Sequence, residues 1–251
     1  MAPLKILGII PARFNSTRLP GKPLYNFFDR PMIWWVYQET KKVAALDRVV
    51  VAGDDQRIMD ACQALDMEYI KTSAENPTHL HRLQEVASRL EADYYVCVCG
   101  DEPLITAEAI SHIIPAASSK EAQPYASLLT RAMDDRQDIE SDSNIKVVTN
   151  IHSECMLFTR GITPYDFGKK TPVYRKIIGV ECYNKSGLDF FVSSSPGFLE
   201  ETEDIALLRF LEHGFKVRAV HVDTYQLSVD NQIDLVKVKK IMTEREGFAH
   251  G

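Results

Sequence analysis

Three basic side chains follow the first apolar run of the chain within ten residues. Arg13, Arg18 and Lys22 come after residues 4–10, a run that is typical of a buried parallel strand. Ligands of open α/β sheets bind just beyond the carboxyl ends of the strands, so these cations stand where a polyanion could be held. Proline and glycine residues stiffen the segment and let its backbone approach a ligand closely. The pattern predicts a triphosphate-binding loop, although a solvated basic turn would use the same residues.

Two aspartates follow other apolar segments. Asp101 comes shortly after the run at 94–98, and Asp230 directly follows Val229. Magnesium prefers hard oxygen ligands, and transfer of a nucleotidyl group depends on neutralising phosphate charge. Asp101 and Asp230 are therefore candidate Mg²⁺ ligands. Each could instead serve only as a helix cap.

Alternating strands and helices must position these side chains. Apolar runs predict strands at 4–10, 48–52, 67–70, 94–99, 125–130, 144–149, 155–160, 177–184 and 216–222. Helices are predicted at 31–44, 55–66, 80–91, 106–117, 186–193, 201–213 and 231–245. Asp54 and Thr106 are the expected N-caps of the second and fourth helices. The alternation predicts one α/β domain over residues 1–251, with a mostly parallel sheet and a smaller mixed lobe near 150–200.

Composition narrows the class of protein. The net charge of −6 and the pI of 5.7 argue against general nucleic-acid binding, so the basic loop is a local feature. No apolar stretch reaches the ~18 residues of a membrane span, and the N-terminus lacks a signal-peptide layout, so a cytoplasmic enzyme is expected. The five cysteines are expected to be free thiols. His79 and His81 have no evident partners for a zinc site.

Three motifs together resemble those of a known family. Residues 9–23 read IIPARFNSTRLPGKP, residues 99–105 read CGDEPLI, and Ser228-Val229-Asp230 precedes Asp234-Leu235. They resemble, in order and approximate spacing, the motifs of the CMP-Kdo synthetases (3-deoxy-manno-octulosonate cytidylyltransferases) over roughly residues 5–240. The resemblance implies a three-layer nucleotide-diphospho-sugar transferase-like fold. It also implies CTP as substrate, Mg²⁺ on the two aspartates, and a homodimer formed through the 150–200 lobe.

The resemblance also implies roles for individual residues. It assigns nucleotide binding to Pro11, Ala12, Arg13, Arg18, Lys22, Thr72, Ser73 and Arg82, and catalysis to Arg13, Lys22 and Asp101. One segment departs from the pattern: where the family usually has S-G-T-[DE]-R, this chain has T-H-L-H-R at 78–82. We therefore expect an altered loop around His79. Thr72 and Ser73 could also form an ordinary turn.

The acceptor site departs further from the family pattern. Cys99 stands in place of a glutamine, and Ile177 stands in place of a histidine in the family's R-H-L-G-I-Y, which here reads K-I-I-G-V-E. Neither replacement offers comparable hydrogen bonds to a sugar. Arg160 and Glu203 match an arginine and a glutamate of the family, and Arg160 could bind a carboxylate, although both could be ordinary surface residues.

These residues predict a cytidylyltransferase that joins CMP from CTP to a small acidic acceptor other than Kdo. Another ulosonic acid or a phosphonate would fit, and Lys146, His79 and His81 are further cations that could attract it. Two other functions stay open. One is transfer from an activated sugar nucleotide during surface polysaccharide synthesis, because spore-coat polysaccharide proteins share a similar loop. The other is nucleotide-dependent regulation without turnover. A dinucleotide-dependent oxidoreductase is disfavoured, since no G-x-G-x-x-G turn follows the first strand.

Overall fold

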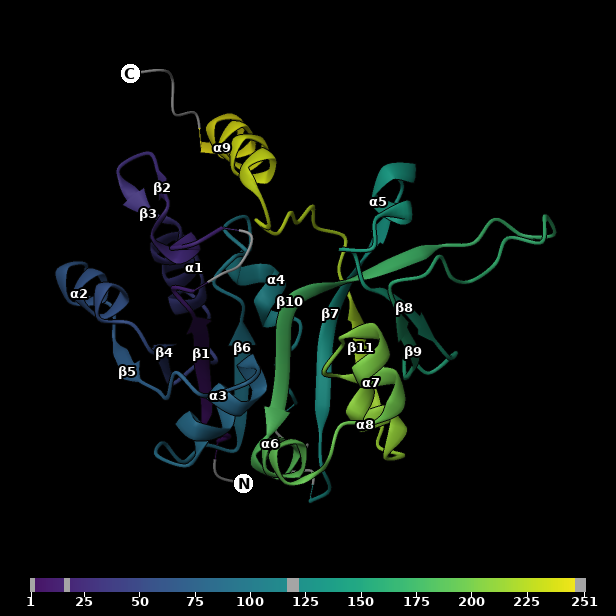
Figure 1. Ribbon diagram of the computed structural model, residues 1–251, viewed down its shortest axis with the longest axis horizontal. Helices are drawn as coiled ribbons and strands as arrows, with labels where there is room; N and C mark the ends of the chain where they lie inside the picture. The colour runs from purple at the N-terminus through teal and green to yellow at the C-terminus, as the bar shows by residue number, and fades with distance from the viewer. Residues whose placement is uncertain (1–2, 16–18, 117–121, 247–251) are drawn as a thin grey trace.

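A central sheet of nine strands organises the chain (Figure 1). The computed structural model describes residues 3–15, 19–116 and 122–246, so Arg18 lies outside the described residues. Seven strands follow the spatial order β11-β7-β10-β6-β1-β4-β5, while β8 pairs with β10 and β9 pairs with β8. The strands are β1 (Ile6–Ala12), β4 (Arg48–Gly53), β5 (Tyr69–Lys71), β6 (Tyr94–Val98), β7 (Ala126–Met133), β8 (Lys146–Thr149), β9 (Cys155–Thr159), β10 (Tyr174–Asn184) and β11 (Val217–His221).

The predicted mostly parallel sheet is confirmed. β1 pairs in parallel with β4 and β6, β4 with β5, and β7 with β11. β10 runs antiparallel to both β6 and β7. In the registers of the central strands, Ile9 lies opposite Val50 on one side and Cys97 on the other. The carboxyl ends of β1, β4 and β6 therefore meet at one edge, where α/β sheets bind ligands.

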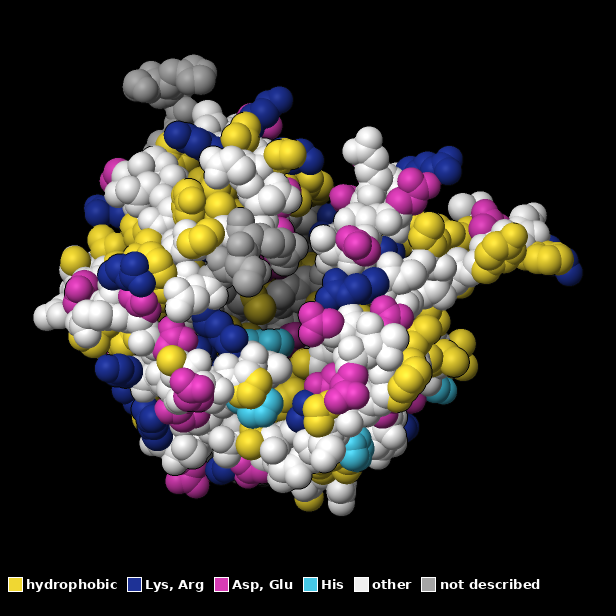
Figure 2. All heavy atoms as spheres, viewed as in Figure 1, with side chains coloured by type: hydrophobic (Ala, Val, Ile, Leu, Met, Phe, Trp, Pro, Cys, Tyr) yellow, Lys and Arg dark blue, Asp and Glu magenta, His cyan; other side chains and the backbone are white. Residues whose placement is uncertain are grey.

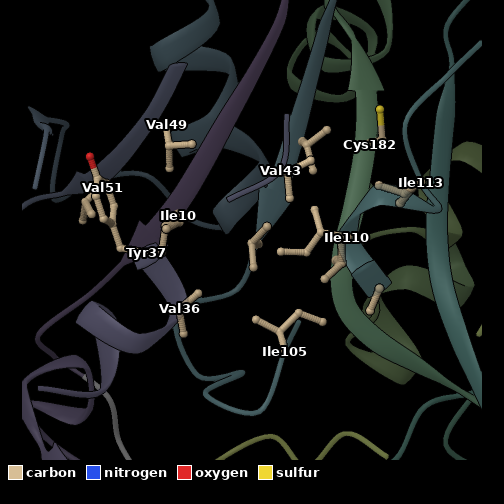
Figure 3. Packing of buried hydrophobic residues seen from close by; sticks show 14 of the residues in the cluster. Ile10, Val36, Tyr37, Val43, Val49, Val51, Ile105, Ile110, Ile113 and Cys182 are labelled. Carbon is tan, nitrogen blue, oxygen red and sulfur yellow. The ribbon is translucent and has the colours of Figure 1, made fainter. Parts of the chain in front are cut away.

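Helices cover both faces of the sheet and complete three layers. Apolar residues of α1 (Met32–Lys41), α2 (Gln56–Ala64) and α4 (Ala107–Ser111) share one buried cluster with alternate residues of β1, β4 and β6, part of which Figure 3 shows. A second cluster joins α3 (His79–Ala87), α6 (Lys185–Ser193) and α8 (Leu208–Glu212) to the strand residues of opposite parity. This alternation is the period-two pattern of strands that are buried on both faces.

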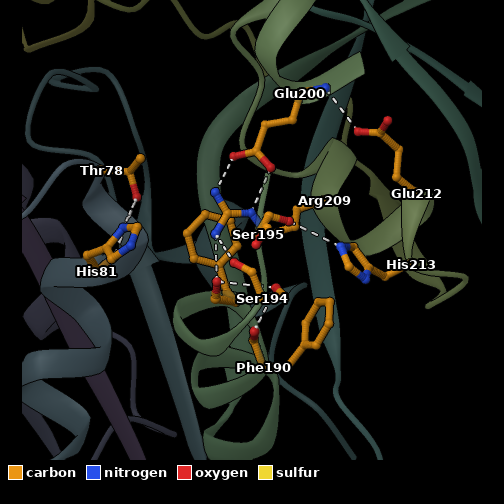
Figure 4. A network of polar contacts seen from close by, with 10 residues as sticks. Thr78, His81, Phe190, Ser194, Ser195, Glu200, Arg209, Glu212 and His213 are labelled. Atoms are coloured by element: carbon orange, nitrogen blue, oxygen red, sulfur yellow. Dashed lines mark hydrogen bonds and ion pairs between the residues drawn. The ribbon is translucent and has the colours of Figure 1, made fainter. Parts of the chain in front are cut away.

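The prediction of one continuous helix at 201–213 is wrong. The structure has two helices there, α7 (Phe198–Glu203) and α8, because Asp204 adopts a left-handed conformation with φ of 52°. A buried ion pair fixes the two helices: Arg209 donates to both carboxylate oxygens of Glu200 at 2.6 and 2.7 Å (Figure 4). Arg209 also donates to the carbonyl of Phe191 in α6. Periodicity did not reveal this break, since the interruption depends on a tertiary contact.

Other boundaries also differ from the predictions. α4 ends at Ser111 instead of 117, and α2 is capped by Asp55, not Asp54. Thr106 caps α4 as predicted, by accepting from the amide of Ala109. The elements that the sequence did not predict are η1 (Lys22–Leu24), β2 (Asn26–Phe27), β3 (Arg30–Pro31) and α5 (Arg136–Glu140).

The C-terminal helix α9 (Gln232–Glu246) packs over the ligand edge of the sheet. Its Leu235, Val238 and Met242 share a buried cluster with residues that include Leu104 and Val229. This packing brings the segment before α9 against the segment after β6. None of the described helices is long and apolar enough to cross a membrane.

A projecting arm extends from the mixed lobe. Residues 160–173 connect β9 to β10, and the segment beyond Arg160 projects from the body of the molecule (Figure 1). Tyr165 and Phe167 are 85% and 79% exposed, and Ile162 and Val173 are more than half exposed. The arm therefore presents apolar side chains that this protomer leaves uncovered.

All five cysteines are free thiols, as expected.

Candidate functional site

A cleft of about 360 Å³ lies at the carboxyl ends of β1 and β6. Its walls come from three segments: the loop after β1, the start of α3 and the turn after β6. The lining residues that bear on the chemistry are Pro11, Ala12, Arg13, Lys22, His79, Cys99 and Asp101. Figure 2 shows a hollow at the centre of the displayed face, with basic side chains and a histidine at its walls.

The loop after β1 owes its shape to Gly21. This residue has φ of 71°, a conformation that L side chains rarely adopt, and its amide donates to the carbonyl of Phe14 at 2.8 Å. An added Cβ would lie 3.0 Å from the Phe14 ring. The closed loop starts the short helix η1 directly at Lys22, so backbone geometry fixes where this ammonium group stands.

Lys22 lies between the two aspartates that the sequence selected. Its Nζ is 2.5 Å from Asp101 Oδ2 and 3.8 Å from Asp230 Oδ1, and it donates to the carbonyl of Val229 at 2.9 Å. Burial opposes the charge of Lys22, but the Asp101 carboxylate and its hydrogen bond, with Asp230 beside them, raise the pKa of the ammonium above its usual value. The structure thus brings Lys22, Asp101 and Asp230 together, although 129 positions separate the two aspartates.

Buried polar contacts hold the segments that carry these aspartates. The amide of Val229 donates to the carbonyl of Asp101 at 2.9 Å. The Glu102 carboxylate accepts from the Gly179 amide of β10 and from the Ser228 hydroxyl. Burial of Glu102, together with the nearby Asp101 charge, raises the pKa of Glu102 to about 7. One buried side chain therefore links the turn after β6, the middle of β10 and the segment before α9.

The donor set at this point fits magnesium. Two carboxylates reach the same ammonium group and are each about a quarter exposed, at 27% for Asp101 and 26% for Asp230. They supply hard, negatively charged oxygens beside open space, which is what Mg²⁺ requires for shared ligation with phosphate oxygens and water. Asp101 and Asp230 are the residues that would hold the ion.

Arg13 connects the cleft to a second polar group. Its guanidinium donates to the carbonyl of Asn76, and burial together with the nearby Arg82 lowers the pKa of Arg13. Arg82 is fully buried; it donates to the Thr72 hydroxyl and, at 2.7 Å, to Asp54. Asp54 therefore pairs with Arg82 instead of capping α2. Of these two guanidinium groups, only that of Arg13 lines the cleft, where an anionic ligand could reach it.

Thr72 and Ser73 follow β5, beside this group. The Thr72 hydroxyl also donates to the carbonyl of Gly53, and the Ser73 amide donates to Glu85 at 2.8 Å. Thr72 and Arg82 are buried, and none of the three residues lines the cleft. Their assignment to cytidine stays a prediction.

The four residues assigned to the acceptor lie in two places. Cys99 lines the cleft, and Ile177 is half-buried against the apolar cluster below it. Arg160 and Glu203 contact each other away from the cleft lining: the Glu203 carboxylate accepts from the Thr159 hydroxyl and from the amide of Arg160. Glu203 thereby ties α7 to the end of β9.

The sequence comparisons identify the family. The cytidylyltransferase family matches residues 7–222. The chain is 32% identical to the 3-deoxy-manno-octulosonate cytidylyltransferase of Bdellovibrio bacteriovorus, over 96% of this chain and 99% of that protein. It is 36% identical to the corresponding enzyme of Pseudomonas fluorescens, over 93% and 96% of the two chains. The chain belongs to the cytidylyltransferase family.

Structural comparisons agree with this family. A CMP:2-keto-3-deoxy-manno-octonic acid synthetase solved in complex with CTP matches this cytidylyltransferase with a TM-score of 0.90 and 31% identity, over 96% of this chain and 99% of that one. A cytidylyltransferase from Leptospira borgpetersenii matches with a TM-score of 0.65 and 17% identity, over 96% and 87% of the two chains, and supports the fold alone. The predicted family and three-layer fold are confirmed.

Sequence reasoning missed part of this cytidylyltransferase's site. It did not find the partner of His79: Nε2 of this histidine lies 2.9 Å from a carboxylate oxygen of Glu181 on β10. The signal was present, because Glu181 is a charged residue inside the otherwise uncharged segment Ile177–Tyr183. A charge in a buried strand requires a partner, which only the fold could identify.

Proposed function

We propose that this cytidylyltransferase transfers CMP from CTP to a small acidic acceptor and releases pyrophosphate. The observation that carries the proposal is Lys22, whose ammonium stands between Asp101 and Asp230 at the ligand edge of the sheet. This arrangement joins a cation for phosphate oxygens to two carboxylates for a divalent ion. A hydroxyl oxygen of the acceptor would bond to the α-phosphorus, the bond to the β-phosphate oxygen would break, and the hydroxyl proton would leave to solvent.

Each side chain would act through charge and position. Lys22 and Arg13 would bind the triphosphate and neutralise charge that develops as pyrophosphate leaves. Asp101 and Asp230 would hold Mg²⁺, which when bound supplies Lewis-acid polarisation of phosphate oxygens. Arg18 stays a proposed third contact to the triphosphate. No covalent enzyme intermediate is required, because in-line attack by the acceptor completes the transfer.

The acceptor would be an acid other than Kdo. The relatives are named for 3-deoxy-manno-octulosonate, but this chain offers a thiol at Cys99 and an alkyl group at Ile177, where the resemblance implies polar contacts. Each missing hydrogen bond is worth about 0.5–1.5 kcal/mol, and more where a sugar hydroxyl would be buried unpaired. A related ulosonic acid fits this site, and a phosphonate is the second candidate.

Pyrophosphate release tests the proposal. The protein is incubated with CTP, MgCl₂ and a panel of ulosonic acids and phosphonates, and each reaction is matched by one without acid and one with GTP. We expect acid-dependent release with CTP and the corresponding CMP-ester by mass spectrometry. Release with no acid of the panel, combined with activity on a preformed sugar nucleotide, would favour the alternative transferase.

We also propose that a second copy of the chain covers the arm at 160–173. Its exposed Tyr165 and Phe167 are large apolar side chains on a projecting segment, which is typical of an association surface. Light scattering should report a dimer at micromolar concentration, and replacement of both residues by serine should shift it toward monomer. A wild-type protein that scatters as a monomer would contradict the proposal.

A further inference from the structure

His79 and Glu181 form an ion pair at the wall of the cleft. His79 is the first residue of α3 and lines the cleft, with its side chain 32% exposed. Its Nε2 lies 2.9 Å from Oε2 of Glu181, and the Tyr183 hydroxyl donates to the same oxygen at 2.8 Å. Glu181 lies opposite Cys97 in the β6–β10 register and is buried. The carboxylate faces inward, and the imidazole stands between it and the cleft.

The surroundings of this pair favour the protonated form of the His79 ring at the cleft wall. Burial alone would lower the pKa of His79, but the Glu181 charge and hydrogen bond raise it above the ordinary value. Burial of Glu181 is in turn outweighed by His79 and by the Tyr183 hydroxyl, which lower the pKa of Glu181. A carboxylate only accepts hydrogen bonds, so Nε2 of His79 must donate to it. In the protonated ring, Nδ1 is a second donor, and it forms no hydrogen bond within the part of the chain that the structure describes.

The other cations proposed for the acceptor already have partners. The Nε, Nη1 and Nη2 atoms of Arg160 donate to the backbone carbonyls of Glu203, Asp142 and Asp204. Lys146 is fully buried, and its Nζ donates to two further backbone carbonyls. These side chains stabilise the lobe and do not line the cleft.

Few cations line the cleft and remain available to the two substrates. Among the described residues that line it, the positively charged side chains are Arg13, Lys22 and His79. The proposed function assigns the first two to the triphosphate, which leaves His79 for the other substrate. Cys99 also lines the cleft, and nearby Cys97 packs in the same buried cluster as Tyr183. The planar, protonated ring of His79 can donate a hydrogen bond to a carboxylate. The weakly polar thiol of Cys99 beside it leaves this ring as the main polar contact on the acceptor.

We propose that protonated His79, held in place by Glu181, binds the carboxylate of the acceptor acid through Nδ1. The inference deepens the proposed function, on which it rests, by naming the side chain that reads the acid. Glu181 acts as a positioning residue, because it orients the ring and does not reach the substrate itself. The pair thereby takes over the anion-binding task that the sequence had assigned to Arg160.

A binding experiment that needs no turnover tests the inference. The probe is Kdo, which carries the carboxylate that His79 would bind although the rest of the sugar lacks polar partners at Cys99 and Ile177. It is titrated at millimolar concentration, to allow for this weaker binding, into protein labelled with ¹⁵N-histidine, while NMR follows the imidazole nitrogens. Comparison with His79→Gln assigns the His79 signals. We expect Kdo to shift the His79 signals, with the methyl ester of Kdo shifting them much less, because the ester lacks the anion.

Matched variants separate charge from structure. Losing a charged hydrogen bond should weaken Kdo binding about tenfold to a hundredfold in His79→Gln. His79→Lys should retain part of the affinity. Glu181→Gln, in which Tyr183 keeps a hydrogen-bond partner, should lower the pKa of His79 and weaken binding at neutral pH. His81→Gln is the control, since His81 bonds to Thr78 and packs on Phe191 away from the cleft lining (Figure 4).

Three results would overturn the inference: no shift of the His79 signals with Kdo, equal shifts with its ester, or unchanged Kdo affinity in His79→Gln. A fourth test is titration with Co²⁺. His79, Cys97 and Glu181 place possible ligand atoms within 4.8 Å of one another, so a metal ion could bind there instead. A thiolate–Co²⁺ absorption band that Cys97→Ser abolishes, at stoichiometric metal, would make the cluster a metal site instead. Failure of the proposed function looks different: Kdo would bind through His79, yet no acid would release pyrophosphate from CTP.

Discussion

Replacing Lys22 with methionine should have opposite effects on metal binding and on turnover. The ammonium of Lys22 lies 2.5 Å from Asp101 and 3.8 Å from Asp230. Before nucleotide binds, it therefore interacts with the two carboxylates that a divalent ion would need as ligands. Methionine keeps most of the apolar stem but removes the charge. The substitution removes the Lys22 charge from between the two carboxylates, and the triphosphate loses one of its contacts.

Both magnitudes follow from the geometry. Unit charges about 4 Å apart interact by ~1 kcal/mol in water and ~4 kcal/mol at a protein surface. With the carboxylates about a quarter exposed, removal of the ammonium should tighten binding of a divalent ion by an amount between these limits. Loss of a charged donor to the transition state should cost about 2–4 kcal/mol, or roughly 30-fold to 1000-fold in kcat/KM.

Two assays check the opposite signs. Electron paramagnetic resonance of Mn²⁺ measures metal affinity in protein without nucleotide, and pyrophosphate release measures kcat/KM for CTP. Lys185→Met is the matched control, because Lys185 forms its ion pair with Asp189 on α6, away from the cleft. Weaker Mn²⁺ binding in Lys22→Met would refute the view that the ammonium competes with the ion. Normal kcat/KM would refute its role at the triphosphate.

Three further predictions concern neighbouring residues. Asp101→Asn and Asp230→Asn should each lower turnover by orders of magnitude and weaken Mn²⁺ binding; normal turnover in either variant would remove that residue from the metal site. The double variant Cys99→Gln/Ile177→His should raise kcat/KM for Kdo and lower it for the native acid, and unchanged kinetics with both acids would contradict the specificity argument. Glu102 has its pKa raised to about 7, so its contribution to stability is full below the unfolded pKa near 4.5 and is lost as pH rises through 7. Urea unfolding with a chelator present should therefore show the free energy of unfolding of Glu102→Gln rising relative to wild type by about 2.5 kcal/mol between pH 5 and pH 8. A constant difference would mean that Glu102 titrates normally.

The predicted and observed folds agree best where burial repeats along the chain. The sequence predicted β1, β4, β6 and β7 because strands that are buried on both faces form largely apolar runs. The errors fall where a tertiary contact outweighs local pattern. Asp204 breaks the helix predicted at 201–213, while the Arg209–Glu200 pair fixes the two resulting helices. Asp54 forms an ion pair with Arg82, and Asp55 caps α2 in its place.

The candidate site divides in the same way. Sequence by itself determined the family and predicted the basic loop and the two aspartates, because short motifs place their chemistry within a few residues of one another. It could not determine that Lys22 stands between those aspartates, since they follow strand and loop segments that only the packing of α9 brings together. Nor could it pair His79 with Glu181, which lie on a helix and a strand 102 residues apart. Long-range neighbours of this kind are set by the order of strands in the sheet and by burial in its core, and a sequence records neither directly.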